Sequence, residues 1–107
     1  MTYGLTDKQV TQIRQVLAAN PRVEQAILFG SRAKGNYKPG SDIDLALKGT
    51  ALVYKDLLRL DNALDDLNLP VETDLILYHQ ISDPAVREHV DRVGLTLYSR
   101  TRQEAER

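Results

Sequence analysis

The sequence contains no cysteine, and no apolar run comes near the ~20 residues that span a bilayer. Without cysteine there can be neither a disulfide framework nor a thiolate metal site, which fits a reducing cytoplasm. The first ten residues, MTYGLTDKQV, lack the basic-then-apolar pattern of a signal sequence. A formal net charge of −1 argues against a general nucleic-acid-coating protein, which usually carries a strongly basic face. We therefore expect a cytoplasmic protein without a membrane segment or strong nucleic-acid binding.

The length and the apolar fraction indicate a small globular protein. The 107 residues suffice for one domain with a single core, and 42% of them are hydrophobic, an ordinary share for such a domain. We expect a single domain over residues 1–107, with a frayed tail at 100–107. The five tyrosines are scattered, so they predict no aromatic platform for single-stranded nucleic acid.

Hydrophobic periodicity predicts an alternation of helices and strands. Thr6 and Gln9 have the form of a capping box before a helix that ends at Asn20-Pro21. Leucines from 57 to 67 predict a second helix, and Asp83-Pro84 opens a third that Gly94 would cap. The predicted strands cover residues 23–29, 42–47 and 71–78, with a short edge strand at 95–98. This order predicts an α/β domain with a mixed sheet and helices on one face.

Two aspartates interrupt what otherwise reads as a core strand. Asp42 and Asp44 project from the same side of that strand, about 7 Å apart at the backbone. Asp74, in the next strand, faces away from the core residues beside it. If the polar faces align, three carboxylates converge, and at least one of them would hold a proton unless a divalent cation neutralises them. Oxygen-only ligands suit Mg²⁺ or Mn²⁺, whereas the alternative interpretation is the solvated face of a half-exposed sheet.

The loop before these aspartates has features that suit a phosphate. Gly30-Ser31 directly follows a buried strand, where free backbone N–H groups can bind an anion, and Gly30 permits close approach. Arg32 and Lys34 add positive charge beside the turn, and Ser41 either orients the Asp42 loop or begins the strand. Neither a Walker loop nor a Rossmann fingerprint is present. His79 and His89 could each approach a site, but a surface or packing role is favoured. For Tyr37, a plain loop tyrosine is favoured over self-modification.

The stretch "GSRAKGNYKPGSDIDLAL" resembles the signature of the DNA polymerase β-like nucleotidyltransferase superfamily. That signature is Gly-Ser, a spacer, Asp-x-Asp between apolar residues, and a third acid on a later strand. More narrowly, the chain resembles the minimal nucleotidyltransferases from its first helix through the final "GLTLY". The resemblance implies a polymerase β-like fold and an enzyme that moves a nucleoside monophosphate from a triphosphate to an acceptor hydroxyl, releasing pyrophosphate.

The resemblance also implies roles for individual residues. Gly30 and Ser31 would hold the β- and γ-phosphates. Two Mg²⁺ ions would bind Asp42 and Asp44, and Asp74 would bind the second ion and help to remove the acceptor's proton. From charge and proximity alone, we expect Arg32 and Lys34 to steady the triphosphate.

Length suggests the acceptor, because larger relatives carry a second domain for which this sequence has no residues left. Minimal nucleotidyltransferases are typically paired with a HEPN-domain protein, in many cases as antitoxin and toxin. The leading hypothesis is transfer of AMP from ATP to a tyrosine of a HEPN ribonuclease. One alternative is an antitoxin or nucleotide-binding module that acts by complex formation with weak or absent catalysis. Another is small-molecule nucleotidylation with a separate acceptor-binding subunit; an Asp-x-Asp sugar transferase would need a far longer chain.

Overall fold

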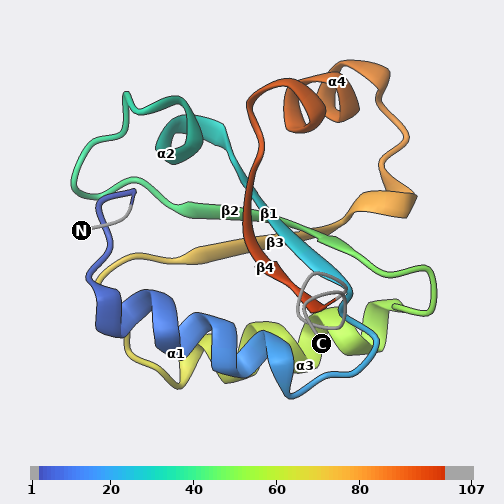
Figure 1. The fold of residues 1–107 in the computed structure, drawn as a ribbon, viewed down its shortest axis with the longest axis horizontal. Coiled ribbons are helices and arrows are strands. Elements are labelled where there is room, and N and C mark those ends of the chain that lie inside the picture. The colour runs from blue at the N-terminus through green and yellow to red at the C-terminus, as the bar shows by residue number, and fades with distance from the viewer. Residues whose placement is uncertain (1–2, 101–107) are drawn as a thin grey trace.

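The computed structural model of the protein describes residues 3–100 (Figure 1). Apart from Arg100, the tail expected at 100–107 lies outside the described residues. Within them, no helix is long and apolar enough to cross a membrane. The elements are α1 (Asp7–Ala18), β1 (Gln25–Phe29), α2 (Gly30–Lys34), β2 (Ile43–Lys48), α3 (Tyr54–Asp65), β3 (Thr73–Leu77), the short 3-10 helix η1 (Tyr78–Gln80), α4 (Pro84–Val93) and β4 (Leu95–Ser99).

The four strands form one mixed sheet in the order β3-β2-β1-β4, which confirms the predicted fold class. β1 pairs antiparallel with β2 and with β4, and β2 pairs parallel with β3. The pairing of β1 with β4 has a register shift between Ala26 and Ile27. The polar faces of β2 and β3 align in this register, because Asp44 lies directly opposite Asp74.

Alternation along the strands places the main core between the sheet and the two long helices. Ile43, Leu45 and Leu47 of β2 are fully buried there with Leu28 of β1. Helices α1 and α3 run beneath this face of the sheet (Figure 1). Their own apolar residues, among them Ile13, Leu17, Leu60 and Leu64, complete the core. Asp44 of β2 and Asp74 of β3 therefore lie on the other face of the sheet.

Helix α4 departs from the expectation that the helices share one face. Its Val90 is 1% exposed and packs with Ile27 and Ala46 on the opposite face of the sheet. In Figure 1, α2 and α4 lie on the side of the sheet away from α1 and α3. The valine stripe of α4 predicts that one side of the helix is buried, but it does not specify against which sheet face.

The predicted capping box at the start of α1 is present, but the glycine at the end of α4 does not act as the predicted cap. Thr6 accepts the Gln9 N–H at 3.1 Å and donates its own N–H to Gln9 Oε1 at 2.9 Å, so the capping box is confirmed. Gly94 does end α4, but its φ of −62° is not the left-handed value of a glycine cap. A Cβ at Gly94 would overlap the Val90 carbonyl and Ile27 instead. Close packing of α4 on the sheet therefore explains this glycine.

Candidate functional site

The Gly30 turn lies against the second aspartate. β1 ends at Phe29, which pairs in register with Asp44, and α2 begins at Gly30. Gly30 has a φ of +75°, a region that favours glycine, and a Cβ there would overlap the Asp44 carboxylate. The turn that was predicted to hold phosphates and a predicted metal-binding carboxylate therefore touch each other.

The three aspartates gather at one end of one sheet face. Asp44 and Asp74 are directly opposite on neighbouring parallel strands, and such strands lie about 4.8 Å apart. Asp42 lies two residues before Asp44, just outside β2, and is exposed. Partial burial raises the pKa of Asp44, and the negative charges of Asp74 and then Asp42 raise it further. The acids are therefore close enough to repel one another.

The chemistry of these acids fits a hard divalent cation, although their arrangement is open. All the available donor atoms are carboxylate oxygens, the type that Mg²⁺ prefers. Among residues 3–100, no three His, Asp or Glu side chains are grouped tightly enough to hold a metal ion as they stand. Asp42 and Asp74 are exposed, so their side chains have room to turn. A cation would relieve the repulsion that raises the pKa of Asp44.

Ser31, Lys34 and Ser41 surround the same loop. Ser31 is half-buried in the first turn of α2, and Lys34 is exposed in its last turn. Ser41 precedes β2, and its hydroxyl accepts the Lys38 N–H at 2.9 Å. Of the two roles left open for Ser41, shaping the loop before Asp42 is therefore the one its contacts support.

Arg32 has a different place from the one predicted. Its side chain is only 3% exposed, although a contact with a triphosphate would require it to be accessible. Nε and Nη2 donate to the Ser41 carbonyl at 3.2 and 2.8 Å, and Nη1 donates to the Tyr3 carbonyl at 2.8 Å. The guanidinium also lies 5.1 Å from the centre of the Tyr37 ring. These contacts support a structural role, in which Arg32 fixes the loop before Asp42, rather than the predicted contact with the triphosphate.

His89 lies beside the site, although the sequence interpretation favoured a surface or packing role. Its ring meets Phe29 edge-on, with centroids 6.2 Å apart and an interplanar angle of 82°. It also interacts electrostatically with Asp44, in the direction that lowers the pKa of that acid. The packing role expected for His89 is present, but its proximity to Asp44 depends on where α4 lies. No local sequence signal carries that information. His79, by contrast, is exposed.

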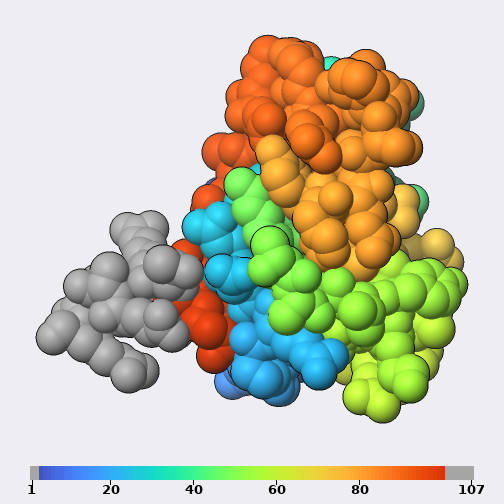
Figure 2. All heavy atoms as spheres, turned by 90° about the vertical axis from the view of Figure 1, so that its right-hand side faces the viewer, coloured from blue at the N-terminus to red at the C-terminus, as the bar shows by residue number. Residues whose placement is uncertain are grey.

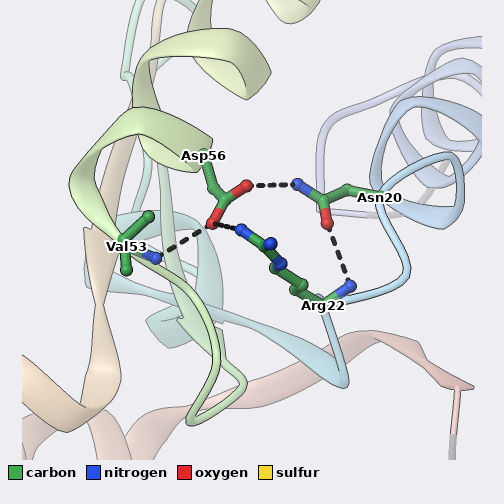
Figure 3. Close-up of polar contacts among 4 residues, drawn as sticks. All are labelled: Asn20, Arg22, Val53 and Asp56. Atoms are coloured by element: carbon green, nitrogen blue, oxygen red, sulfur yellow. Dashed lines mark hydrogen bonds and ion pairs between the residues drawn. The ribbon is translucent and has the colours of Figure 1, made fainter.

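A hollow of about 440 Å³ lies away from the aspartates, beside Asn20, Arg22 and Asp56. Figure 3 shows how the Asp56 carboxylate gathers contacts from Val53, Asn20 and Arg22. The polar groups beside this hollow are therefore hydrogen-bonded to one another, and their role is structural. A smaller hollow of about 230 Å³ adjoins Asp74 between α3 and β3.

Comparison with known proteins agrees with this arrangement. Residues 11–103 match the family described as polymerase beta, nucleotidyltransferase. The chain is 30% identical over 79 residues to MJ1217 of Methanocaldococcus jannaschii, a proposed protein adenylyltransferase, covering 73% of this chain and 80% of that protein.

Two solved structures share the fold. One is a proposed minimal nucleotidyltransferase, with a TM-score of 0.66 and 28% identity over 89% of this chain and 95% of that one. The other is a tri-AMPylated Shewanella oneidensis HEPN toxin in complex with an MNT antitoxin. Its matching chain has a TM-score of 0.68 and 18% identity, over 95% of this chain and 79% of that one.

Proposed function

Because the chain belongs to the polymerase beta nucleotidyltransferase family, we propose that it transfers AMP from ATP to a tyrosine hydroxyl of a HEPN-domain protein. In this proposal the HEPN protein is a ribonuclease toxin, and AMP transfer silences it. The observation that carries the proposal is the contact between the Gly30 turn and Asp44, with Asp74 directly opposite. Nucleotide transfer requires the turn that binds the phosphates to lie beside the carboxylates that act on the transferred group.

The choice of AMP and of a protein acceptor rests on the relatives. The M. jannaschii protein is a proposed protein adenylyltransferase, and the S. oneidensis antitoxin is bound to a toxin that carries AMP groups. These facts favour protein modification over nucleotidylation of a small molecule.

The residues of the site take the following roles. Gly30 and Ser31 hold the β- and γ-phosphates, and Lys34, exposed at the end of α2, adds positive charge beside them. Asp42, Asp44 and Asp74 would hold two Mg²⁺ ions, which when bound offset phosphate charge and acidify the acceptor hydroxyl. Arg32 and Ser41 keep the loop before Asp42 in place.

The transfer step is a substitution at the α-phosphorus of ATP. The tyrosine oxygen forms a bond to that phosphorus, and the bond between the phosphorus and the bridging oxygen to the β-phosphate breaks. Pyrophosphate leaves with the electron pair, and the Asp74 carboxylate accepts the hydroxyl proton. Such transfers depend mainly on positioning and charge stabilisation, so fixed placement of Asp44 against the Gly30 turn matters most.

The decisive experiment uses ATP labelled in its α-phosphate, Mg²⁺ and the HEPN-domain protein proposed as the acceptor. The wild type should label the partner and silence its ribonuclease activity. The Asp42→Asn, Asp44→Asn double variant should do neither. The matched control is Asp65→Asn with Asp66→Asn, which removes two exposed carboxylates outside the site and should behave as wild type. If the site variant silences the ribonuclease without labelling it, the protein acts by complex formation and the transferase proposal fails.

A further inference from the structure

The outer edge of β3 is uncovered. β3 is the last strand in the sheet order, and among residues 3–100 no strand pairs with its outer side. Exposed edges are usually blunted by Pro, Lys or a bulge. β3 (TDLIL) has none of these, whereas the pairing of the other edge strand, β4, contains a register shift. An edge of this kind is a template for an added strand.

The register shows which backbone groups are available. Ile43 N–H donates to the Glu72 carbonyl at 2.9 Å, and Ile43 lies opposite Thr73. In a parallel pair, alternate residues turn their backbone groups toward the neighbour. Glu72, Asp74 and Ile76 therefore face β2, and the N–H and C=O groups of Thr73 and Leu75 point outward. The free groups lie on either side of Asp74.

The surface beside this edge suits an apolar and basic segment. The hollow of about 230 Å³ between α3 and β3 is lined by Tyr54, Leu58 and Asp61 together with Thr73 and Asp74. Tyr54 is 64% exposed and Leu58 is 47% exposed. The charged side chains in its wall are both acidic, so the hollow attracts a cation and repels an anion. Figure 2 views the molecule from the right-hand side of Figure 1, with α3 at the lower right.

We propose that an extended segment of the partner protein pairs with the outer edge of β3 and so brings its tyrosine beside Asp74. This inference rests on the proposed function, whose acceptor it positions. In the antiparallel arrangement, which is the more stable per residue, a residue opposite Asp74 forms a non-hydrogen-bonded pair with side chains about 4.5–5.5 Å apart. Its two neighbours point toward the hollow beside Leu58, so they are apolar, and the residue beyond each neighbour returns to the face of Asp74, where the acids favour a basic residue.

Binding can be tested with a peptide, without ATP or metal. The probe is a fluorescein-labelled peptide with a central Tyr, a Val on each side and an Arg beyond each Val, measured by anisotropy. Thr73→Pro removes one outward N–H at the first residue of an edge strand, a position that tolerates proline. Thr73→Val is the matched control, because it keeps the N–H and removes only a buried hydroxyl that has no hydrogen-bond partner. We expect the proline variant to bind about tenfold more weakly than the valine variant.

Two further measurements do not depend on the proline variant folding. Methylating the peptide nitrogens of both valines should weaken binding as much as Thr73→Pro does. In the wild type, the amide hydrogens of Thr73 and Leu75 should exchange rapidly and slow at least tenfold when the peptide is added. Those of Asp74 and Ile76, which face β2, should be slow in both states.

The outcomes separate the two proposals. Equal binding by both Thr73 variants, with no slowing of the outward amides, would overturn docking at the edge and leave the transferase proposal intact. If exchange at Thr73 and Leu75 slows with rising protein concentration in the absence of peptide, a second copy of this chain pairs with the edge. That result would also overturn docking of the partner. Retained peptide binding with no AMP transfer to the HEPN protein would overturn the transferase and leave the docking surface.

Discussion

Gly30 and Gly35 share a backbone conformation but differ in their surroundings. Their φ values are +75° and +84°, so both lie in the region that favours glycine. A Cβ at Gly30 would overlap the Asp44 carboxylate, whereas a Cβ at Gly35 would have no atom within 4 Å. Comparing alanine at the two positions therefore isolates the contact between the turn and the acid.

We expect Gly30→Ala and Gly35→Ala each to lower the free energy of unfolding by about 1 kcal/mol through backbone strain, with a further loss for Gly30→Ala. Only Gly30→Ala displaces Asp44, so its rate of AMP transfer should fall about 100-fold, while Gly35→Ala should retain most of its activity. Urea denaturation and labelled-AMP transfer measure the two effects. Equal losses of transfer in both variants would show that the contact with Asp44 is unimportant.

Asp44 carries a stability cost that its proposed role in holding a metal ion would explain. Burial, and then repulsion from Asp74 and Asp42, raise its pKa in the folded protein. The folded state therefore binds this proton more tightly than the unfolded chain, so ionised Asp44 destabilises the protein above the ordinary pKa of 3.8. Below that pH the carboxyl is protonated in both states and the cost disappears.

Asp44→Asn should therefore raise Tm by a few degrees at pH 7 in EDTA while abolishing AMP transfer. The gain in Tm should shrink as the pH falls toward 3.8 and vanish below it. Calorimetry at a series of pH values measures the difference from the wild type. A variant that is less stable than the wild type at neutral pH would contradict the electrostatic cost assigned to Asp44.

At the scale of elements, Asp56 joins the start of α3 to the loop that follows α1. Its Oδ2 accepts the Val53 N–H at 3.0 Å and contacts Arg22 Nη1 at 3.3 Å, and its Oδ1 accepts from Asn20 Nδ2 at 3.3 Å. The Val53 N–H is the largest influence that lowers the pKa of Asp56, and Asn20 and Arg22 lower it further. This carboxylate therefore stabilises the folded state above the ordinary pKa of 3.8.

Asp56→Ala should lower Tm by several degrees at neutral pH, because it leaves the Val53 N–H without its capping acceptor. The difference in Tm from the wild type should shrink as the pH falls below 3.8. In that range the pH passes through the lowered pKa of Asp56 in the folded wild type, so the carboxylate becomes protonated and loses its stabilising effect. Asp65→Ala, an exposed change on the same helix, is the control and should leave Tm unchanged. A difference in Tm that stays constant as the pH is lowered would contradict a stabilising role for the charge of Asp56.

Features that depend on residues close together in the sequence could be predicted, whereas features that depend on tertiary contacts could not. The capping box of Thr6 and Gln9 depends on residues three apart, so the start of α1 could be read directly. Arg32 bonds to carbonyls 9 and 29 residues away, and its basic side chain gave no sign of burial. The position of His89 beside Asp44 likewise required knowing which sheet face α4 covers.

At the scale of the whole molecule, Arg100 ties the last strand to the first part of the chain. Its Nη2 donates to the carbonyls of Ala18 and Asn20 at 2.9 and 3.2 Å, and its Nε donates to that of Val23 at 3.2 Å. Arg92 is a contrasting arginine, since it is exposed and, within residues 3–100, forms an ion pair only with Glu88 one helical turn away.

Arg100→Ala should lower the free energy of unfolding by about 1–2 kcal/mol, because three carbonyls lose a charged donor. Arg92→Ala should change it by no more than about 0.5 kcal/mol, as expected for a surface ion pair. Urea denaturation at equilibrium measures both. Equal effects from the two arginines would show that the contacts of Arg100 do not hold β4 to the rest of the fold.

The convergence of the acids could be expected from sequence because it depends on alternation and strand pairing alone. Asp44 and Asp74 each sit at a polar position of an otherwise apolar strand, and parallel pairing in register brings them together. The sequence could not indicate that Asp42 would lie outside the strand, or that the acids would form an open group rather than a closed cage. Those details depend on side-chain placement in three dimensions.

The central position of β1 has a consequence for how the protein is made. β1 is the first strand synthesised, yet one of its two neighbours is β4, about 70 residues later in the chain. A nascent chain on the ribosome can therefore pair β1 with β2 early, but the opposite edge of β1, with its apolar Ile27 and Leu28, stays open until residues 95–99 emerge. Until then chaperones, or another nascent chain, can meet this edge as well as the outer edge of β3.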